Sequence, residues 1–236
     1  MLRTGHRRIE RSLSAATAIA ESDPPRDAEE SELGILDTLG SVVLVRRDAA
    51  LFYEGDSADY YYKVVSGAVR SCKLLADGRR HITDFFLAGD FIGVEALDTH
   101  QCTAEAVNDA TVIRYERRII DALVSRSPRV GKFLLGRVCA ELSEARARML
   151  LLGRMSARER LASFLLRIAA RSRREDCDTV ALPMTRSDIG DHLGLTTETV
   201  CRTFTQLKSA GLIDAPGPHE LRLLKHQALA ALAQGG

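Results

Sequence analysis

The hydrophobic period of the sequence changes once, near Ser127, and this change limits the chain to sheet followed by helix. From about Leu33 to Tyr115, short β-type apolar runs such as residues 42–45 alternate with glycine-containing turns, and Asp77-Gly78 between two runs is typical of a hairpin. After Ser127, apolar residues recur in steps of three and four. The pattern predicts an α+β chain, with an all-β sandwich or roll before the helices.

A long helix is expected directly after the change of period. Ser127 can cap it and Pro128 suits its first turn. Its apolar positions form one seam, made of Val130, Leu134, Val138, Leu142, Ala145, Met149 and Leu152. The regular spacing resembles two to three heptads of a coiled coil and favours a symmetric homodimer, with burial against the chain's own β domain as the alternative. A further helix is expected from about Ser156 to Arg171, followed by a polar loop, RSRREDCDTVALPM.

Residues 185–211, TRSDIGDHLGLTTETVCRTFTQLKSAG, predict two short helices joined by a tight turn. Thr185, followed three residues later by Asp188, is an acidic form of the capping box and starts the first helix. Gly194 ends that helix, because glycine readily adopts the left-handed conformation needed there. Thr196 is the expected N-cap of the second helix. The pattern is that of a helix-turn-helix.

The second helix has two faces. Its packed side is predicted to hold Val200, Phe204 and Leu207, and its presented side Glu198, Cys201, Arg202 and Thr205. Arg202 can donate two hydrogen bonds to a guanine edge and Glu198 can accept from a cytosine amino group, each contact contributing about 1–3 kcal/mol of discrimination. A surface ion pair between them, contributing only about 0.3–0.5 kcal/mol, is the alternative. The capped first helix and the glycine turn favour DNA binding, and residues 211–226 predict a β-wing.

The order of β-roll, long helix and winged helix-turn-helix, with ETVCR at 198–202, resembles the CRP/FNR superfamily of bacterial transcription regulators. Glu198 and Arg202 match the FNR/FixK branch, Cys201 replaces its serine, and Thr197 stands where the cyclic-AMP receptor branch has arginine. The resemblance covers nearly everything after residue 30. It implies a cyclic-nucleotide-binding-type β-roll at 31–126, a dimerisation helix at 127–152 and a winged helix-turn-helix DNA-binding domain at 153–236. Residues 1–30, which end in an acidic stretch with two prolines, are expected from their composition to form a flexible tail.

The same resemblance implies what the protein binds and controls. The expected target is a palindromic FNR/FixK box of the TTGAT-N4-ATCAA type, bound by a homodimer with half-sites about one helical turn apart. Base contacts are assigned to Glu198, Cys201, Arg202 and Thr197, and phosphate contacts to Thr185, Arg186, Thr196 and Thr199. The implied role is a transcription activator that works with RNA polymerase on low-oxygen, denitrification or nitrogen-fixation genes.

Charge and cysteine content fit a cytoplasmic DNA-binding protein. Residues 126–174 contain thirteen Lys or Arg and three Asp or Glu, a stretch suited to phosphates, although a solvated helical face explains it equally well. The five cysteines are odd in number and widely spaced, which favours a reducing compartment over a disulfide framework. The sequence has no apolar run of membrane-spanning length and no signal-peptide core, so neither membrane nor export is expected.

The roll is expected to work without a cofactor. Relatives that bind a cyclic nucleotide have arginine next to Ser or Thr at the phosphate, whereas this chain has Cys102-Thr103-Ala104 and no Lys or Arg between Arg80 and Arg114. Residues 1–71 contain no cysteine, so the iron-sulfur cluster of FNR proteins is not expected. A ligand- or haem-responsive roll is the alternative, with His81 or His100 as candidate axial ligands.

Cys201 has two interpretations. It lies near a helix N-terminus and beside Arg202, surroundings that favour a thiolate. It is either a passive replacement for serine that touches a thymine methyl group, or a redox switch whose oxidation puts a bulky charged group against the DNA. The sequence offers no nucleophile-base-acid set, phosphate loop or metal-spaced ligands, so it predicts neither catalysis nor a metal site.

Overall fold

The computed structural model describes residues 38–94, 97–172, 179–217 and 219–235, apart from the side chains of several residues between 141 and 154 and of Ser172. The chain divides into two compact units, residues 1–38 and 39–236, and nearly all described residues belong to the second. The tail predicted at 1–30 and Cys177 lie outside the described residues. Of the helices described, none is both long and apolar enough to cross a membrane.

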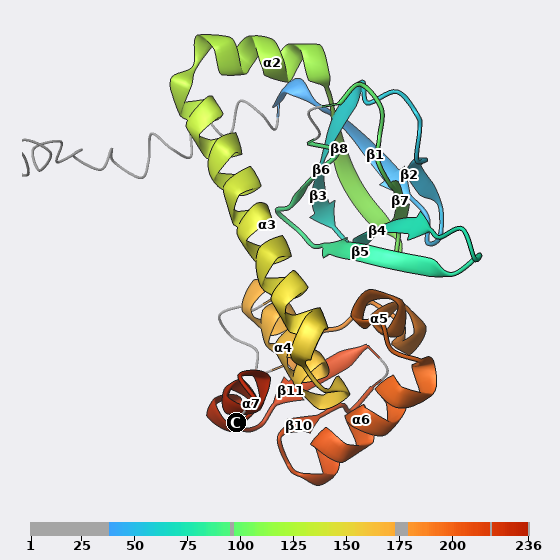
Figure 1. Cartoon of the computed structure of the whole chain (residues 1–236). Coiled ribbons are helices and arrows are strands. Elements are labelled where there is room, and N and C mark those ends of the chain that lie inside the picture. Colours follow the sequence, from blue (N-terminus) through green and yellow to red (C-terminus); the bar gives the residue numbers. More distant parts are fainter. Residues whose placement is uncertain (1–37, 95–96, 173–178, 218, 236) are drawn as a thin grey trace, which may run out of the picture. The chain divides into compact units, whose positions relative to one another are not determined.

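Two four-stranded antiparallel sheets form the β-roll (Figure 1). The first has the order β1 (Ser41–Val45), β8 (Ala110–Glu116), β3 (Tyr60–Ser66), β6 (Phe91–Ile92), and the second β2 (Ala50–Phe52), β7 (Thr103–Ala106), β4 (Val69–Leu74), β5 (Arg80–Phe86). Fully buried side chains from both sheets, including Val64 and Val69, share one core. The predicted hairpin joins β4 to β5, where Gly78 adopts a left-handed φ of 81°.

Two helices follow the roll. The sequence interpretation extends the β-roll segment to residue 126 and misses α2 (Arg117–Arg126), a short helix whose buried side is Ile120. α3 (Pro128–Arg154) begins where predicted, and the Ser127 hydroxyl accepts a 3.5 Å hydrogen bond from the Val130 N–H. A charged, ten-residue segment such as α2 gives too short a periodic signal to distinguish it from the end of a strand.

The apolar seam of α3 divides into a covered part and an exposed part. Val130 is only 3% exposed, so it is already packed within the protomer, and Leu134 is partly buried. Further along the helix, Val138, Leu142 and Met149 are 39%, 48% and 72% exposed, and Leu135 is also exposed. Ala145 is partly buried, and the side chain of Leu152 lies outside the described set. Burial within the chain therefore accounts for the start of the seam, and its later part is exposed in a single chain.

The C-terminal region is a winged helix-turn-helix. It consists of α4 (Ala157–Ser172), β9 (Thr179–Ala181), α5 (Arg186–Leu193), α6 (Thr197–Ser209), β10 (Ile213–Asp214), β11 (Glu220–Leu223) and α7 (His226–Ala233). The strands pair antiparallel in the order β10-β11-β9. The interpretation of residues 171–184 as a polar loop is wrong for β9, because Val180 is buried and pairs with Leu221 of the wing.

One apolar cluster joins the roll to the helices of the winged region. Its members include Ile82 and Phe85 of β5 together with Leu161, Phe164 and Leu165 of α4. The rings of Phe85 and Phe164 meet edge to face, with their centroids 6.0 Å apart. The outer face of the second sheet is thus covered by α4, and α5 also packs against β5. This shared core has no signature in the sequence, because its members lie about 80 residues apart.

Candidate nucleic-acid interface

Local caps fix the two helices of the helix-turn-helix. At the start of α5, the Asp188 N–H donates to the Thr185 hydroxyl and the Asp188 carboxylate accepts from the Thr185 N–H, which completes the predicted capping box. Gly194 ends α5 in the left-handed conformation with φ 65°. Gly190 lets the turn close tightly, since a Cβ there would lie 2.6 Å from the Leu195 carbonyl oxygen. The predicted turn geometry is confirmed.

Arg160 adds support to this turn that the sequence did not reveal. Its side chain, on α4, donates to the Leu193 carbonyl at the end of α5 and to the Met155 carbonyl between α3 and α4, both at 3.0 Å. A cation is favourable at a helix C-terminus, where carbonyl groups lack partners within the helix. Because Arg160 reaches a carbonyl 33 residues away, no local pattern could have identified it.

The recognition helix α6 packs with one face and presents the other. Val200, Phe204 and Leu207 are buried as predicted, and Thr203 is buried as well. Glu198, Cys201, Arg202 and Thr205 are all exposed. Glu198 and Arg202 form no ion pair or hydrogen bond with each other in the part of the chain that is described. The surface ion pair considered as the alternative is therefore not formed.

The threonine hydroxyl groups at the starts of α5 and α6 differ in whether a proton is left for an outside acceptor. The Thr185 hydroxyl accepts from the Asp188 N–H and donates its proton to the Asp188 carboxylate at 2.7 Å, so this proton is already used. At the start of α6, the Thr196 hydroxyl accepts from the Thr199 N–H and bonds to the Thr199 hydroxyl at 2.9 Å. That mutual bond uses one of two hydroxyl protons, which leaves the other for an external acceptor. Thr197 is exposed beside this pair.

Arg186 lies at the first position of α5 and stacks on the recognition helix. Its guanidinium carbon is 3.4 Å from the centroid of the Phe204 ring, a cation–π contact. Burial lowers the pKa of Arg186, and the nearby Cys201 thiol acts in the opposite direction. One guanidinium nitrogen, Nη1, is buried without a hydrogen-bond partner. Arg186 therefore connects the two helices and keeps one donor unused.

The roll residues at the family's cyclic-nucleotide position are occupied by protein contacts. The Thr103 hydroxyl accepts from the Glu54 N–H at 3.0 Å. Glu105 accepts from the Arg70 guanidinium at 2.8 Å, and Arg70 comes from the neighbouring strand β4. The sequence has no Lys or Arg between Arg80 and Arg114. The negative charge of Glu105 in this stretch is instead balanced by Arg70, which comes from an earlier strand. Arg70, the cation that contacts Glu105 in the described part of the chain, is thus already paired with carboxylates.

The two candidate haem ligands have structural contacts. His100 is only 2% exposed and stacks on Phe52 with ring centroids 3.5 Å apart. His81 lies on β5, and its Nδ1 is 3.1 Å from the Asp191 carbonyl oxygen. Within the described residues, no group of three or more His, Cys, Asp or Glu side chains could hold a metal ion.

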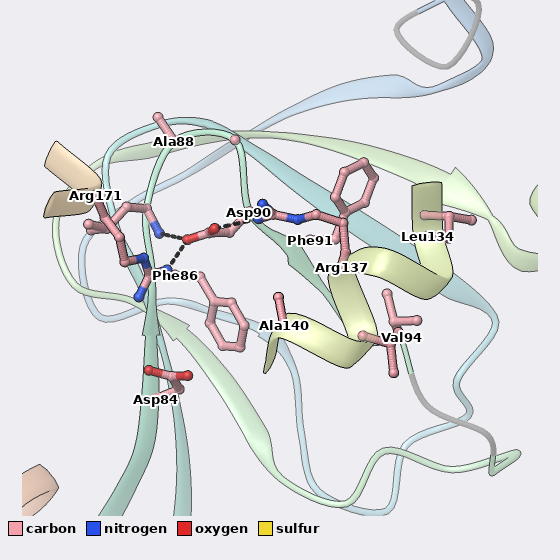
Figure 2. Close-up of a pocket in the computed structure, with 13 residues that line it drawn as sticks. Asp84, Phe86, Ala88, Asp90, Phe91, Val94, Leu134, Arg137, Ala140 and Arg171 are labelled. Carbon is pink, nitrogen blue, oxygen red and sulfur yellow. Dashed lines mark hydrogen bonds and ion pairs between the residues drawn. The ribbon is translucent and has the colours of Figure 1, made fainter. Parts of the chain in front are cut away.

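A cavity of about 310 Å³ lies between the β5–β6 loop, α3 and α4. Figure 2 shows Asp90 at its edge, between Arg137 of α3 and Arg171 of α4. Arg137 donates to Asp90 at 2.8 Å, and Arg171 donates to the other carboxylate oxygen. Apolar side chains, Phe86 and Leu134 among them, line the cavity together with these charged groups. Arg171 Nη1 is buried and has no hydrogen-bond partner.

Comparisons with known proteins agree with this architecture. Residues 42–127 match the model of the cyclic nucleotide-binding domain, and residues 159–232 match that of the Crp-like helix-turn-helix domain. The nitrogen fixation regulation protein FixK of Azorhizobium caulinodans is 38% identical over 220 residues, which is 92% of this chain and 87% of that protein. FixK of Bradyrhizobium diazoefficiens is 39% identical over 198 residues, 83% of this chain and 84% of that protein.

A solved structure extends the likeness to three dimensions. The structure of FixK2 from Bradyrhizobium japonicum superposes with a TM-score of 0.78 and 40% sequence identity, over 82% of this chain and 96% of that one. From the matched domains, the identity to FixK proteins and the capped helix-turn-helix, the chain belongs to the FixK branch of the CRP/FNR family of DNA-binding transcription regulators.

Proposed function

We propose that this regulator binds an FNR/FixK box of the TTGAT-N4-ATCAA type and reads its bases with Glu198 and Arg202. The observation that carries the proposal is the state of these two side chains, which are exposed on α6 without partners among the described residues. Unpaired charges on a rigid, capped helix are available to base edges in the major groove. Cys201 and Thr197 lie on the same exposed surface and are assigned contacts with neighbouring bases.

Phosphate contacts are proposed for the helix starts. The second hydroxyl proton of the Thr196–Thr199 pair is the donor best suited to this role. Arg186 is assigned a phosphate contact as well, and this contact requires its buried Nη1 to become accessible when DNA binds. Thr185 can contribute its hydroxyl proton only if its bond to Asp188 opens, so its contact is the weakest of the four.

Retardation of a TTGAT-N4-ATCAA duplex tests the base contacts. Arg202→Ala is expected to weaken binding by about 1–3 kcal/mol for each half-site, because a bidentate guanine contact is lost. Lys208→Ala is the matched control, since Lys208 lies on the same helix but bonds to Asp214 and the Ala215 carbonyl. Equal affinities of the Arg202→Ala variant and the wild type would remove Arg202 from the interface.

A homodimer along α3 is part of the proposal. The exposed apolar side chains of Val138, Leu142 and Met149 are at spacings that place them on one side of the helix, together with Leu135. A palindromic site requires two copies of α6 related by a two-fold axis. Leu142→Glu is expected to convert the dimer to monomer in sedimentation experiments. The same change at the exposed Ala140, two residues away and therefore on the opposite side of the helix, should leave the dimer intact.

The physiological role is inferred from the relatives. Relatives from rhizobia are named nitrogen fixation regulation proteins, and one from Rhodopseudomonas palustris is named a transcriptional activatory protein. We infer an activator that contacts RNA polymerase and controls low-oxygen, denitrification or nitrogen-fixation genes. A genome-wide map of bound sites at high and low oxygen checks this; sites outside such genes would contradict it.

Redox control through Cys201 is a further part of the proposal. Cys201 is exposed on the reading surface, whereas Cys72 is buried and burial raises the pKa of its thiol. Hydrogen peroxide converts a thiolate to a sulfenate and is reduced to water, which would enlarge the side chain at the DNA. Peroxide should weaken DNA binding by wild type and by Cys139→Ser, but not by Cys201→Ser; an equal loss in all three would refute the switch.

An effector-responsive regulator is the second candidate function. It is favoured by the cavity beside Asp90, where the buried Nη1 of Arg171 lacks an acceptor that a ligand could supply. Haem absorbance or a nucleotide in the purified protein, together with weak DNA binding after its removal, would support this function. Full DNA affinity in ligand-free protein would exclude it.

A further inference from the structure

Asp188 joins the helix-turn-helix to the roll in addition to capping its own helix. One carboxylate oxygen, Oδ2, accepts from the N–H and hydroxyl of Thr185 at 3.0 and 2.7 Å. The other, Oδ1, accepts from Arg70 Nη1 at 3.2 Å and from Arg80 Nη2 at 2.7 Å. The side chains of Asp188 and Arg70 are only 3% and 8% exposed. A carboxylate this deeply buried is stable because two guanidinium groups and two neutral donors surround it.

Further carboxylates balance the two arginines. Arg80 donates through Nε and Nη2 to Asp191 Oδ2, at 2.9 and 2.8 Å. Arg70 donates to Glu105 at 2.8 Å and to Asp48 at 3.0 Å. The four residues that link strands β4 and β5 to helix α5, Arg70, Arg80, Asp188 and Asp191, are called the roll clamp below.

A second polar link lies beside the clamp. Arg167 of α4 donates to Asp84 at 3.0 Å and to His192 Nε2 at 2.8 Å. Arginine can only donate, so Nε2 accepts and the proton of the neutral imidazole lies on Nδ1. Nδ1 then donates to the Ile82 carbonyl at 3.0 Å. Both ring nitrogens of His192 are thus used to connect α5 with β5 and α4.

These contacts hold α5 from one side and leave the reading face of α6 open. Asp188, Asp191 and His192 all bond to strand β5 through side-chain or backbone atoms. Glu198 and Arg202 on α6 remain exposed.

We propose that the roll clamp holds the helix-turn-helix against the roll in its DNA-binding arrangement. In a ligand-dependent regulator an effector stabilises that arrangement, whereas here side chains of the protein itself do so. The effect on DNA binding rests on the proposed function, whereas the attachment of α5 to the roll does not. Two parts of a protein are coupled when contacts between them form in one arrangement and are lost in another. The clamp supplies contacts of this kind between strands β4 and β5 and helix α5.

The test uses full-length protein and Arg80→Gln, which removes the charge that Asp191 and Asp188 share. Asp188 itself is unsuitable for this test, because its loss would also remove one half of the capping box of α5. The control is Arg79→Gln, since Arg79 neighbours Arg80 but is 78% exposed and pairs with Asp77 in the hairpin turn. Asp191→Asn and the double variant Arg80→Gln/Asp191→Asn complete a cycle that measures the coupling of the pair.

Two readouts are needed: backbone hydrogen exchange without DNA, and affinity for the FNR/FixK box. Arg80→Gln and Asp191→Asn are expected to speed exchange in α5 and β5 while β1 and β8 keep their protection, and to reduce DNA affinity about tenfold, within the 5–150-fold range usual for coupled sites. Arg79→Gln should match the wild type in both, and the double variant should lose little more than either single variant.

Unchanged exchange in α5 overturns the clamp. Faster exchange with unchanged or increased DNA affinity overturns its role in fixing the binding arrangement. Loss of protection throughout the roll would mean general unfolding and also counts against a local clamp. If wild-type protein does not bind the box, the proposed DNA target fails, but the exchange experiment still decides whether the clamp holds α5 to the roll.

Discussion

The two helices of the helix-turn-helix use charge in opposite ways. On α5, Asp188 and Asp191 face the roll and are bound by two arginines at distances of 2.7–3.2 Å. On α6, Glu198 and Arg202 are four residues apart, close enough to pair, yet they are exposed and form no ion pair in the described part of the chain. The helices are adjacent and joined by one tight turn.

This difference separates structural charge from charge that is available for recognition. A buried carboxylate must be paired to be stable, so the two carboxylates that α5 turns to the roll contribute to the fold and are already paired. Exposed charges on a supported helix contribute little to folding and keep their hydrogen-bonding capacity for DNA. Loss of the buried Asp188 carboxylate should therefore reduce stability directly, whereas substitutions on the outer face of α6 should change DNA binding with little effect on stability.

Asp188→Ala is expected to have the largest effect on folding. It leaves Arg70 and Arg80 without their shared carboxylate and removes the Asp188 half of the capping box of α5, so the free energy of unfolding should fall by about 3–5 kcal/mol. Urea unfolding followed by circular dichroism measures this. Asp77→Ala provides the comparison, because Asp77 is exposed in a hairpin and should leave the unfolding midpoint nearly unchanged. Similar midpoints for both variants would contradict the structural role of Asp188.

Gly194→Ala tests the turn between α5 and α6. The φ of 65° is strained for alanine, although a Cβ would meet only Arg160 Nη1 at 3.8 Å, so the expected loss of about 1–2 kcal/mol comes from the backbone alone. Gly136→Ala lies inside α3 with nothing within 4 Å of the added Cβ, and should instead stabilise by about 0.5–1 kcal/mol. Thermal unfolding should move in opposite directions for the two variants; a shift in the same direction would argue against backbone strain at Gly194.

Thr196→Ala is expected to have a smaller effect. It removes the hydroxyl that accepts from the Thr199 N–H, and loss of such an N-cap costs about 1 kcal/mol. Thr196→Ser retains the hydroxyl and should restore most of the stability. If serine and alanine destabilise equally in chemical unfolding, the cap is not the source of the effect.

Arg202→Ala should have the smallest effect on folding. Arg202 is exposed and has no partner in the described fold, so the free energy of unfolding should stay within about 0.5 kcal/mol of the wild type. The same urea titration used for Asp188→Ala provides the measurement. A clear loss of stability would place Arg202 among the structural charges and end the contrast between the two helices.

Local features of this fold could be predicted from the sequence. The capping box at Thr185, the left-handed Gly194 and the buried stripe of α6 depend on residues within one or two turns, and their spacing alone specifies them. The hairpin at Asp77-Gly78 is equally local. The exposed positions Glu198 and Arg202 followed from the same helical periodicity.

Features that depend on distant residues were missed. Arg70 and Asp188 are 118 residues apart, and the shared core joins β5 to α4 across about 80 residues. No local period encodes such partners, so the sequence left Asp188 as a cap only. Strand β9 was missed because its three residues form a strand only through pairing with the wing. The covered start of the α3 seam, Val130, likewise depends on packing that the heptad pattern does not reveal.

Binding to a DNA duplex with one altered base pair tests the central claim most directly. The guanine of each TTGAT half-site is replaced by adenine, with its partner changed to match, and affinities are measured for wild type and Arg202→Ala. Wild type should lose about 1–3 kcal/mol per half-site from this change, whereas Arg202→Ala, which binds more weakly at first, should lose almost nothing further. An equal penalty in both proteins would contradict the account, because the guanine would then be read by a side chain other than Arg202.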